Sequence, residues 1–388
     1  MIKRMANSLK TNCCFRTYLK KEEIMKHIFF VSRCVFFLFL ILSVGGCSDD
    51  DSDGVTYVAG WAVGEAIIYT RNGGQTWVQQ GEDQIPNVFY NDVSAVDFLN
   101  AWVVGESSAD DDEPYGTILR TRDGGQTWTR QGSTESTPNV GFAGVSAVNS
   151  DVAWAVGTNG AVLNTTDGGL TWVQQARDML PNGNFQMVYA VDKNVVWAVG
   201  SDNGTTAVII HTTDGGGTWV RQGENDIPPD PENYYALIDV HAIDAKTAWA
   251  VGSRSSAFMT TDGGLNWTNM TPACVNFLDN NGVCLLTELA GWVVSDSNNF
   301  CYTDDGGNTW THQVAPAVSE ASEAPTLSSA LLGVTAMDEK RAWVVGTNPI
   351  GDEHSIIFHT TDGGNVWERQ ISPANAGFRR VSFAGAKR

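Results

Sequence analysis

Apolar runs of five residues recur along this chain, and polar segments rich in glycine follow each of them. Residues 153–157 read AWAVG, and similar runs occupy residues 60–64, 101–105, 196–200, 248–252, 291–295 and 342–346. Short apolar runs bounded by turn residues predict buried β-strands. Around each run the pattern predicts a meander of four strands: an inner strand such as residues 93–97, the apolar run, a third strand such as residues 208–211, and an outer strand.

A second phrase, of eight residues, closes the hairpin between the third and outer strands. Residues 165–172 read TTDGGLTW, and near-copies occupy residues 70–77, 121–128, 212–219, 260–267, 303–310 and 360–367. Its aspartate can accept hydrogen bonds from turn amides, its glycines can adopt positive φ, and its tryptophan can anchor the hairpin. We therefore expect a structural role for the residue at the aspartate position of each phrase: Asn72, Asp123, Asp167, Asp214, Asp262, Asp305 and Asp362.

The spacing of the two phrases predicts the fold class. The closing tryptophans of successive eight-residue phrases lie 43 to 57 residues apart, and the two phrases together contain all 14 tryptophans. A β-rich repeat of this period is typical of a propeller, with one blade per repeat. We expect an all-β, seven-bladed β-propeller of four-stranded antiparallel blades.

The first unit lacks an inner strand, and the end of the chain supplies a candidate for it. Residues 378–383, FRRVSF, align with residues 90–95, YNDVSA, which precede the second apolar run. We expect the C-terminal strand to pair into the first blade and close the ring, because closure removes an exposed sheet edge.

The N-terminal segment predicts export. From Met25 the sequence reads MKHIFFVSRCVFFLFLILSVGGC, a basic start followed by an apolar run at residues 35–44. This run is about half of the ~20 residues that a membrane-spanning helix needs, but it suits a signal peptide. Residues 44–47, VGGC, resemble the lipobox of bacterial lipoproteins, which implies cleavage before Cys47 and lipidation of that cysteine. The alternative is an ordinary signal peptide with an incidental cysteine.

These features divide the chain into three parts. Residues 1–46 are a signal peptide region, and Met25 is a candidate for its true start. Residues 47–54 are a lipidated acidic tether, and residues 55–388 are one propeller domain. Ser48 resembles the residue that directs such lipoproteins to the outer membrane. We expect a lipid-anchored protein of the bacterial cell envelope, at the outer membrane, facing either the periplasm or the cell surface.

The charge and the cysteine content limit the classes of molecule that the protein can bind. Residues 47–388 carry 16 Lys and Arg against 42 Asp and Glu, a formal charge of −26, which disfavours nucleic acid. Without a CxxC motif or a Cys/His cluster, we expect no metal site and no cofactor. An oxidising compartment permits one disulfide among the three late cysteines, and the short intervening segment favours Cys274–Cys284, which leaves the state of Cys301 open.

The meander places all variable connections at one end of the blades, and loops on a rigid scaffold usually carry function. Two examples are the loop at residues 106–115 and the loop at residues 223–235. They contribute polar and aromatic candidates for a binding face: Asp111, Asp112, Glu113, Tyr115, Tyr234 and Tyr235.

Two further sets complete the candidate binding face. Tyr90, Phe142 and Phe185 stand three residues before the central valine of their inner strands, as an apolar ring at the channel mouth or as packing between blades. Arg379 and Arg380 are an adjacent basic pair, which either binds a ligand or neutralises neighbouring acidic groups.

The eight-residue phrase resembles the Asp-box of sialidase-type (BNR) repeats. Together with the apolar run, it resembles the photosystem II assembly-factor family of seven-bladed propellers, which also occurs in bacterial lipoproteins. The resemblance implies structural boxes and recognition through an arginine-rich patch, although this acidic chain has little basic clustering. Sialidases need an arginine cluster on six blades, and xyloglucanase-type relatives need two propellers, so neither activity fits.

The sequence therefore favours a non-enzymatic, monomeric scaffold or assembly factor that binds a protein partner in the envelope and meets the membrane only through its lipid anchor. The alternative is a surface lipoprotein that binds carbohydrate or glycan. Acidic residues in the loop at 106–115 could form a glycosidase pair, but a solvated acidic loop is the simpler interpretation.

Overall fold

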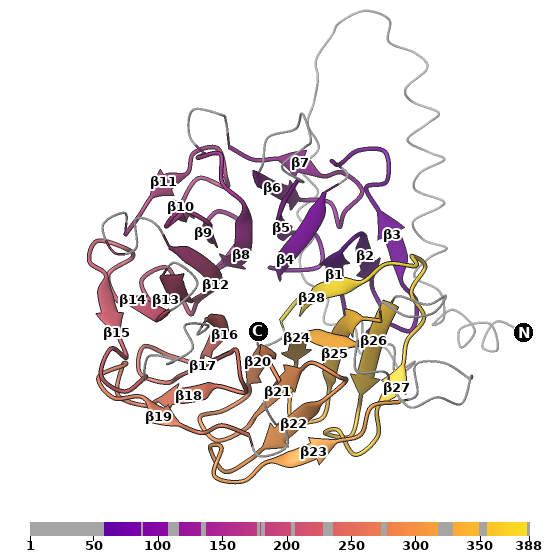
Figure 1. Ribbon diagram of the computed structural model, residues 1–388. Helices are drawn as coiled ribbons and strands as arrows, with labels where there is room; N and C mark the ends of the chain where they lie inside the picture. Colours follow the sequence, from indigo (N-terminus) through magenta and orange to yellow (C-terminus); the bar gives the residue numbers. More distant parts are fainter. Residues whose placement is uncertain are drawn as a thin grey trace, which may run out of the picture. The chain divides into compact units, whose positions relative to one another are not determined.

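The computed structural model describes residues 58–385 except residue 87 and residues 108–115, 133–136, 177–178, 180–182, 203–205, 228–235, 273–277, 317–328 and 349–354. The described residues form seven sheets of four antiparallel strands, arranged as blades around a channel (Figure 1). This is the seven-bladed β-propeller that the repeats predict. The candidates Asp111, Asp112, Glu113, Tyr115, Tyr234 and Tyr235, with Cys47, lie outside the described residues.

Each blade has an inner, a second, a third and an outer strand. The inner strands are β28 (Phe378–Phe383), β4 (Phe89–Ala95), β8 (Phe142–Ala147), β12 (Asn184–Ala190), β16 (Leu237–Ala242), β20 (Asn280–Leu285) and β24 (Ala330–Ala336). The second strands are β1 (Gly60–Gly64), β5 (Ala101–Glu106), β9 (Ala153–Gly157), β13 (Val196–Asp202), β17 (Ala248–Gly252), β21 (Gly291–Ser295) and β25 (Ala342–Thr347). The third strands are β2 (Ile67–Thr70), β6 (Gly116–Thr121), β10 (Val162–Thr165), β14 (Thr206–Thr212), β18 (Ala257–Thr260), β22 (Phe300–Thr303) and β26 (Ser355–Thr360). The outer strands are β3 (Val78–Gln80), β7 (Thr129–Arg130), β11 (Val173–Gln174), β15 (Val220–Gln222), β19 (Thr268–Asn269), β23 (Thr311–Gln313) and β27 (Glu368–Arg369).

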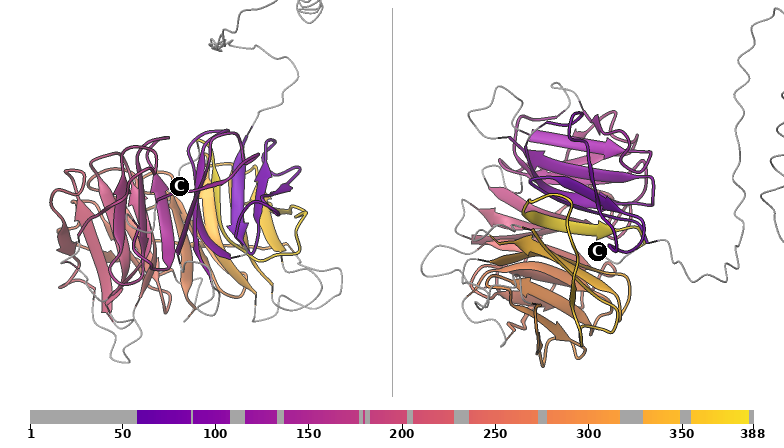
Figure 2. Two further views of the ribbon diagram at one scale, coloured as in Figure 1. Left: turned by 90° about the horizontal axis from the view of Figure 1, so that it is seen from above. Right: turned by 90° about the vertical axis from the view of Figure 1, so that its right-hand side faces the viewer.

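The C-terminal strand closes the ring, as predicted. β28 pairs antiparallel with β1, with Ser382 opposite Trp61, so blade 1 has the order β28-β1-β2-β3 and blades 2 to 7 follow in chain order (Figures 1 and 2). The Phe383 ring stacks on Trp343 of blade 7 with centroids 3.9 Å apart. The Ser382 hydroxyl accepts a hydrogen bond of 3.1 Å from the Ala95 amide of blade 2. One strand therefore joins three blades.

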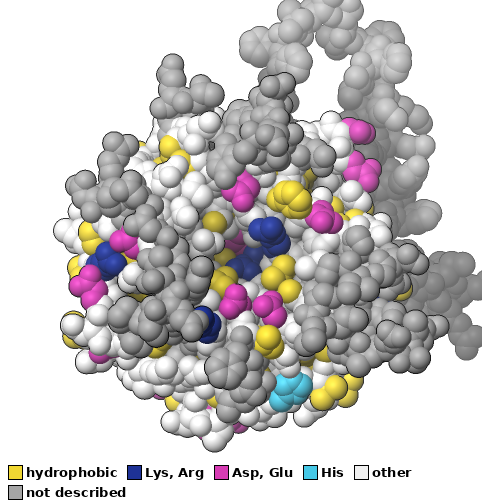
Figure 3. Space-filling view, in the orientation of Figure 1, with side chains coloured by type: hydrophobic (Ala, Val, Ile, Leu, Met, Phe, Trp, Pro, Cys, Tyr) yellow, Lys and Arg dark blue, Asp and Glu magenta, His cyan; other side chains and the backbone are white. Residues whose placement is uncertain are grey.

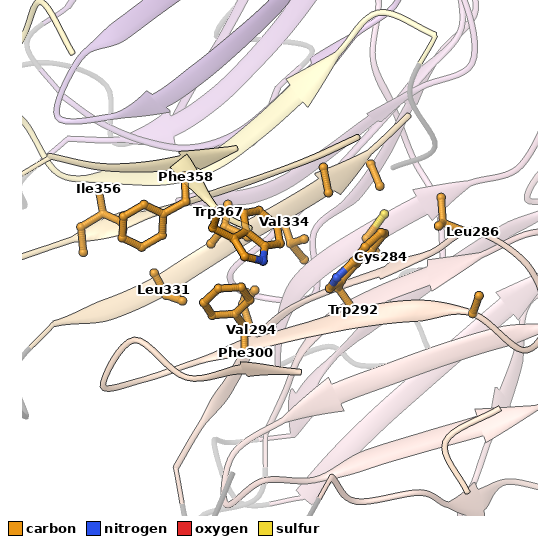
Figure 4. Packing of buried hydrophobic residues seen from close by; sticks show 14 residues of the cluster. Cys284, Leu286, Trp292, Val294, Phe300, Leu331, Val334, Ile356, Phe358 and Trp367 are labelled. Atoms are coloured by element: carbon orange, nitrogen blue, oxygen red, sulfur yellow. The ribbon is translucent and has the colours of Figure 1, made fainter. Parts of the chain in front are cut away.

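The hydrophobic core lies between the blades. In each blade the first five residues of the second strand are buried, because both faces of the sheet pack on a neighbouring blade. In Figure 4, for example, Trp292 and Phe300 of blade 6 pack with Leu331 and Phe358 of blade 7. Tryptophans of the apolar run meet box tryptophans of the next blade edge to face, as in Trp102–Trp172 at 5.7 Å, Trp154–Trp219 at 5.7 Å, Trp197–Trp267 at 6.0 Å and Trp249–Trp310 at 5.9 Å.

The boxes are hydrogen-bonded turns. The Asp167 carboxylate accepts bonds from the Thr171 amide (3.0 Å), the Thr171 hydroxyl (2.6 Å) and the Thr165 hydroxyl (2.9 Å), while Gly168 and Gly169 adopt φ of 75° and 89°. The bond from the Thr171 hydroxyl leads the causes that lower the pKa of Asp167 to about 2. Closely similar bonds surround the equivalent residue of every other box. These side chains form hydrogen bonds within the turn.

A glutamine near the end of the outer strand connects each of several boxes to the preceding blade. The Gln80 amide donates to the Gly124 carbonyl of the next box at 2.7 Å, and Gln222 donates to Gly263 at 2.7 Å. Across the ring closure, Gln370 donates to the Gly73 carbonyl at 2.9 Å and accepts from the Trp77 indole at 3.1 Å. The box is therefore also a contact between blades, a function that the sequence pattern did not reveal.

The cysteine pairing differs from the expectation. In the strand register, Cys284 of β20 lies opposite Trp292 of β21, whereas Cys301 of β22 lies opposite the adjacent Val293. The two cysteines therefore lie on opposite faces of the blade 6 sheet. Cys284 packs against blade 7, and Val293 packs against blade 5. Cys284 carries a thiol and Cys301 is disulfide-bonded, so the predicted Cys274–Cys284 bridge is wrong. Cys274 lies outside the described residues.

Within the described part of the chain, no helix is long and apolar enough to cross a membrane.

Replacement of Phe383 by alanine tests the closure. Phe383 is 1% exposed, so Phe383→Ala removes a buried ring between blades 1 and 7 and should lower the free energy of unfolding by about 3–5 kcal/mol. Denaturant unfolding followed by circular dichroism measures the loss. The matched control is Phe98→Ala, because Phe98 is 63% exposed and its loss should change the free energy by less than ~0.5 kcal/mol. Equal midpoints for Phe383→Ala and the parent protein would contradict closure by β28.

Candidate functional site

The two ends of the blades differ. At one end, which we call the box face, the box turns lie beside the short turns between inner and second strands; the Gly124 amide, for example, donates to the Leu99 carbonyl at 2.9 Å. At the other end, the long-loop face, the inner strands begin and the connections vary in length. Figure 2 shows the strands running between these two faces.

The three aromatic candidates on the inner strands are buried. Tyr90, Phe142 and Phe185 are at most 2% exposed, and each belongs to a cluster that joins two blades. They are packing residues, so their assignment to a binding face is wrong. The sequence periodicity identified the right strands, but it could not show which side of a twisted strand faces the neighbouring blade.

Each inner strand contains a β-bulge directly after this buried position. In β4 the register skips from Tyr90, opposite Gly105, to Asp92, opposite Val104, so that Asn91 has no partner in the ladder. The same skip occurs in all the other inner strands. A bulged residue is left unpaired and its strand bends. We call the seven residues left out of the ladder the bulge ring: Asn91, Ala143, Gln186, Ile238, Asn281, Leu332 and Arg379.

The glycine that ends most apolar runs permits the bulge. A Cβ at Gly105 would lie 2.2 Å from the Phe89 carbonyl oxygen, and one at Gly157 would lie 2.0 Å from the Gly141 oxygen. Glycine is required where another backbone approaches this closely. Gly64, Gly200, Gly252 and Gly346 have the same contact, whereas blade 6 has Ser295 at this position.

The bulge ring lines a hollow of about 340 Å³ at the mouth of the central channel, on the long-loop face. Figure 3 shows basic side chains in the hollow at the centre of the face, with hydrophobic and acidic side chains around them. Thr158, Asn184 and Glu106 add polar groups to its wall. The hollow is therefore amphipathic: it combines side-chain amides, the aliphatic groups of Ile238 and Leu332, two guanidinium groups and the Glu106 carboxylate.

Arg379 and Arg380 lie together at this mouth. Arg379 is exposed; its guanidinium donates to the Asn91 side chain at 2.7 Å and lies 5.9 Å from the centroid of the Phe89 ring. Although the side chain is exposed, partial loss of water around its guanidinium at the channel mouth lowers the pKa of Arg379, while the nearby Glu106 acts in the opposite direction. Arg380 is half-buried and donates to the Leu332 carbonyl. Arg379 is therefore the member of the pair with a side chain available to a ligand.

A second tier of residues lies deeper in the channel and holds the blades together. The Asp92 carboxylate accepts bonds of 2.8 Å from the Val93 amide and from the Val145 amide of the next blade. Asp239 does the same with Val240 (2.8 Å) and Val283 (2.9 Å). Burial raises the pKa of Asp239 to about 6, and Arg380 opposes this rise.

The described residues offer no metal site: no group of three or more His, Cys, Asp or Glu side chains lies close enough to hold an ion. Two histidines pack instead on tryptophan rings: the buried His211 is stacked 3.6 Å from Trp197, and the half-buried His359 is stacked 4.5 Å from Trp343. Burial lowers the pKa of both histidines to about 4, so both are neutral at pH 7. These are blade residues.

The sequence matches the PSII_BNR family, described as photosynthesis system II assembly factor YCF48, over residues 139–237 and 273–376. A structure of YCF48 bound to D1 peptide is 20% identical with a TM-score of 0.54, covering 74% of this chain and 83% of that chain. YCF48 from Cyanidioschyzon merolae is 19% identical with a TM-score of 0.58, covering 79% and 92%. The GH74 xyloglucanase from Xanthomonas campestris is 12% identical with a TM-score of 0.58, covering 85% and 53%. No curated protein matches the sequence significantly.

The Asp239 carboxylate should make stability depend on pH. Its folded pKa of about 6 lies above the unfolded value of about 3.9, so the folded state binds more protons in this interval and stability falls as pH rises from about 4 to about 6. Relative to Asp239→Asn, which cannot titrate, the parent protein should lose roughly 3 kcal/mol of stability across this interval. Denaturant unfolding at several pH values measures both proteins. A difference that stays constant with pH would contradict the buried, proton-retaining carboxylate.

Proposed function

The chain belongs to the family of the photosynthesis system II assembly factor YCF48, and from this premise we propose that it is a non-enzymatic, protein-binding scaffold of the bacterial cell envelope. The bulge ring around the hollow on the long-loop face carries this proposal. It is the place where the repeat scaffold presents seven side chains that differ from blade to blade and are not needed for the ladder.

The hollow suits an extended segment of protein. The Gln186 side chain can exchange hydrogen bonds with a peptide main chain, and Ile238 and Leu332 can contact an apolar side chain. The amide groups of Asn91 and Asn281 instead donate to the carbonyls of neighbouring blades. The Arg379 guanidinium can bind an acidic group of the partner by a charge-assisted hydrogen bond. Because these side chains stand on strands rather than on loops, binding needs little ordering.

The related YCF48 structure contains a bound D1 peptide, and this supports a protein partner by analogy. The likeness to the GH74 xyloglucanase reaches 12% identity and supports the shared fold alone. The alternative of glycan binding keeps one observation in its favour, because side-chain amides such as those in the hollow also recognise sugar hydroxyls. The experiment below separates the two.

A photo-crosslinking amino acid at Leu332, incorporated into the full chain in its native cells, should capture the partner. Arg379→Gln in the same protein should weaken capture by roughly tenfold, because it removes a charge-assisted hydrogen bond of about 1.5 kcal/mol. Mass spectrometry of the adduct identifies a protein or a glycan.

The matched control is Arg122→Gln, which removes an arginine from the box face. Capture of a protein that Arg379→Gln reduces and Arg122→Gln leaves intact supports the proposal. A glycan adduct, or equal capture in all three proteins, overturns it.

We also propose that Cys47 is lipidated and anchors the propeller at the outer membrane. The support is the sequence at residues 25–47 and the acidic tether that follows. One acyl chain gives only marginal membrane binding, so the multiple chains of a lipoprotein would make the attachment stable.

Cys47→Ser should abolish incorporation of labelled palmitate and shift the protein from the membrane fraction to the soluble fraction. Cys34→Ser is the matched control, because Cys34 lies in the segment that the signal peptidase would remove. Retention of label in Cys47→Ser would contradict lipidation at this residue.

A further inference from the structure

An apolar groove of about 580 Å³ lies on the box face, opposite the bulge ring. Its wall includes Tyr69, Arg71, Val96, Asp97, Phe98 and Leu99. Phe98 is 63% exposed and Leu99 is 38% exposed, although both residues are large and hydrophobic. Neither the fold nor the hollow on the long-loop face uses these side chains.

The turn itself does not require Phe98 and Leu99. Their contacts with the fold use backbone groups: the Phe98 carbonyl accepts from the Tyr69 hydroxyl at 3.2 Å, and the Leu99 carbonyl accepts from the Gly124 amide at 2.9 Å. Corresponding turns of four other blades have polar or small residues here, namely Ser150-Asp151, Lys193-Asn194, Ala245-Lys246 and Glu339-Lys340. The hydrophobic pair is therefore an addition to the turn, and exposed apolar groups of this kind mark contacts with proteins or membranes.

Other exposed leucines lie on the same face around the ring. Leu170 and Leu265 follow the glycines of their boxes and are 75% and 80% exposed, and Leu289 in the short turn of blade 6 is 50% exposed. Together with Phe98 and Leu99, they distribute apolar side chains over blades 2, 3, 5 and 6. Such a wide distribution on one face suits a flat, extended surface better than a single small pocket on a partner.

The chain enters the propeller on this face. Val58 bridges Asn72 of the first box, and its amide donates to the Arg71 carbonyl at 3.1 Å. Residues 48–57 separate Val58 from Cys47 and can span at most about 40 Å. A lipid on Cys47 would therefore keep the membrane surface within reach of the box face.

The chemistry of the groove matches a membrane interface. The Arg71 guanidinium donates to the Tyr69 hydroxyl at 3.3 Å and lies 5.7 Å from the Tyr69 ring centroid, beside Phe98. Arginine and tyrosine beside exposed apolar groups suit the level of lipid headgroups, with the apolar groups at the acyl boundary. The formal charge of −26 disfavours anionic lipid, so the fitting surface is a zwitterionic phospholipid.

We propose that the box face rests on a zwitterionic phospholipid surface through Phe98 and Leu99, with Arg71 at the phosphates. The bulge ring, on the opposite face, then points away from the membrane. This inference rests on the proposed anchor at Cys47.

Spin labels test the orientation in the full lipoprotein reconstituted into vesicles of phosphatidylethanolamine and phosphatidylcholine. The label is attached at Phe98→Cys, and the matched control carries it at Phe89→Cys, an exposed phenylalanine (50%) at the start of β4 near the long-loop face. The label at position 98 should collide with apolar oxygen several-fold more, relative to a polar nickel complex, than the label at position 89. Unsubstituted protein corrects for labelling of native cysteines.

The outcomes separate the two proposals. Protein that floats with the vesicles while both labels remain water-accessible overturns the docking surface and leaves the anchor standing; a protein partner for this groove would give that result. Equal lipid exposure at positions 98 and 89 overturns the orientation. Protein that does not float overturns the anchor and the docking surface that rests on it.

Discussion

The burial of both faces of every blade is the constraint on which the rest of the structure depends. A sheet of four short strands cannot bury its apolar face alone, so each blade needs a neighbour on either side, and the row must close into a ring. This need explains why the second strands are continuous apolar runs rather than alternating ones. It also explains the position of Phe383, which the last strand places between Trp343 of blade 7 and Trp77 of blade 1.

Closure of the ring also creates the candidate site. The inner strands converge on the channel, and the bulge in each of them lets the backbone bend there while the buried aromatic or aliphatic residue stays in the core. The carbonyl approach that accompanies the bulge leaves no room for a side chain at Gly105 and Gly157, whereas blade 6 has the same bulge with Ser295 at this position. The next residue is thereby released from the ladder toward the mouth. The fold thus fixes the residues before and after each bulge-ring position. The bulge-ring position itself can vary, from Ala143 to Arg379, with little effect on the fold.

Much of the fold could be predicted from the sequence because the repeated signals are local. Each box is a turn whose hydrogen bonds join residues close together in the sequence. The apolar runs and the alignment of the last strand can likewise be recognised in the sequence alone. The faces of the strands could not be predicted in this way. Tyr90 belongs to the core and its neighbour Asn91 to the hollow, although they are adjacent, because a bulge changes the side on which residues lie. The register of blade 6 likewise separates Cys284 from Cys301, which loop length alone could not show.

The inner strands carry two sets of residues with different roles. Asp92 and Asp239 join the inner strands of neighbouring blades through backbone amides, so a change in this tier affects the stability of the channel. In the bulge ring, the side-chain amides of Asn91 and Asn281 donate to carbonyls of the next blade, and the Asn91 side-chain oxygen also holds Arg379 in place. A substitution in the ring therefore alters the charge and shape of the hollow at a lower cost in stability than one in the channel. In an acidic domain, a single exposed guanidinium fixed in this manner favours a partner with one acidic group beside apolar residues over a highly charged one.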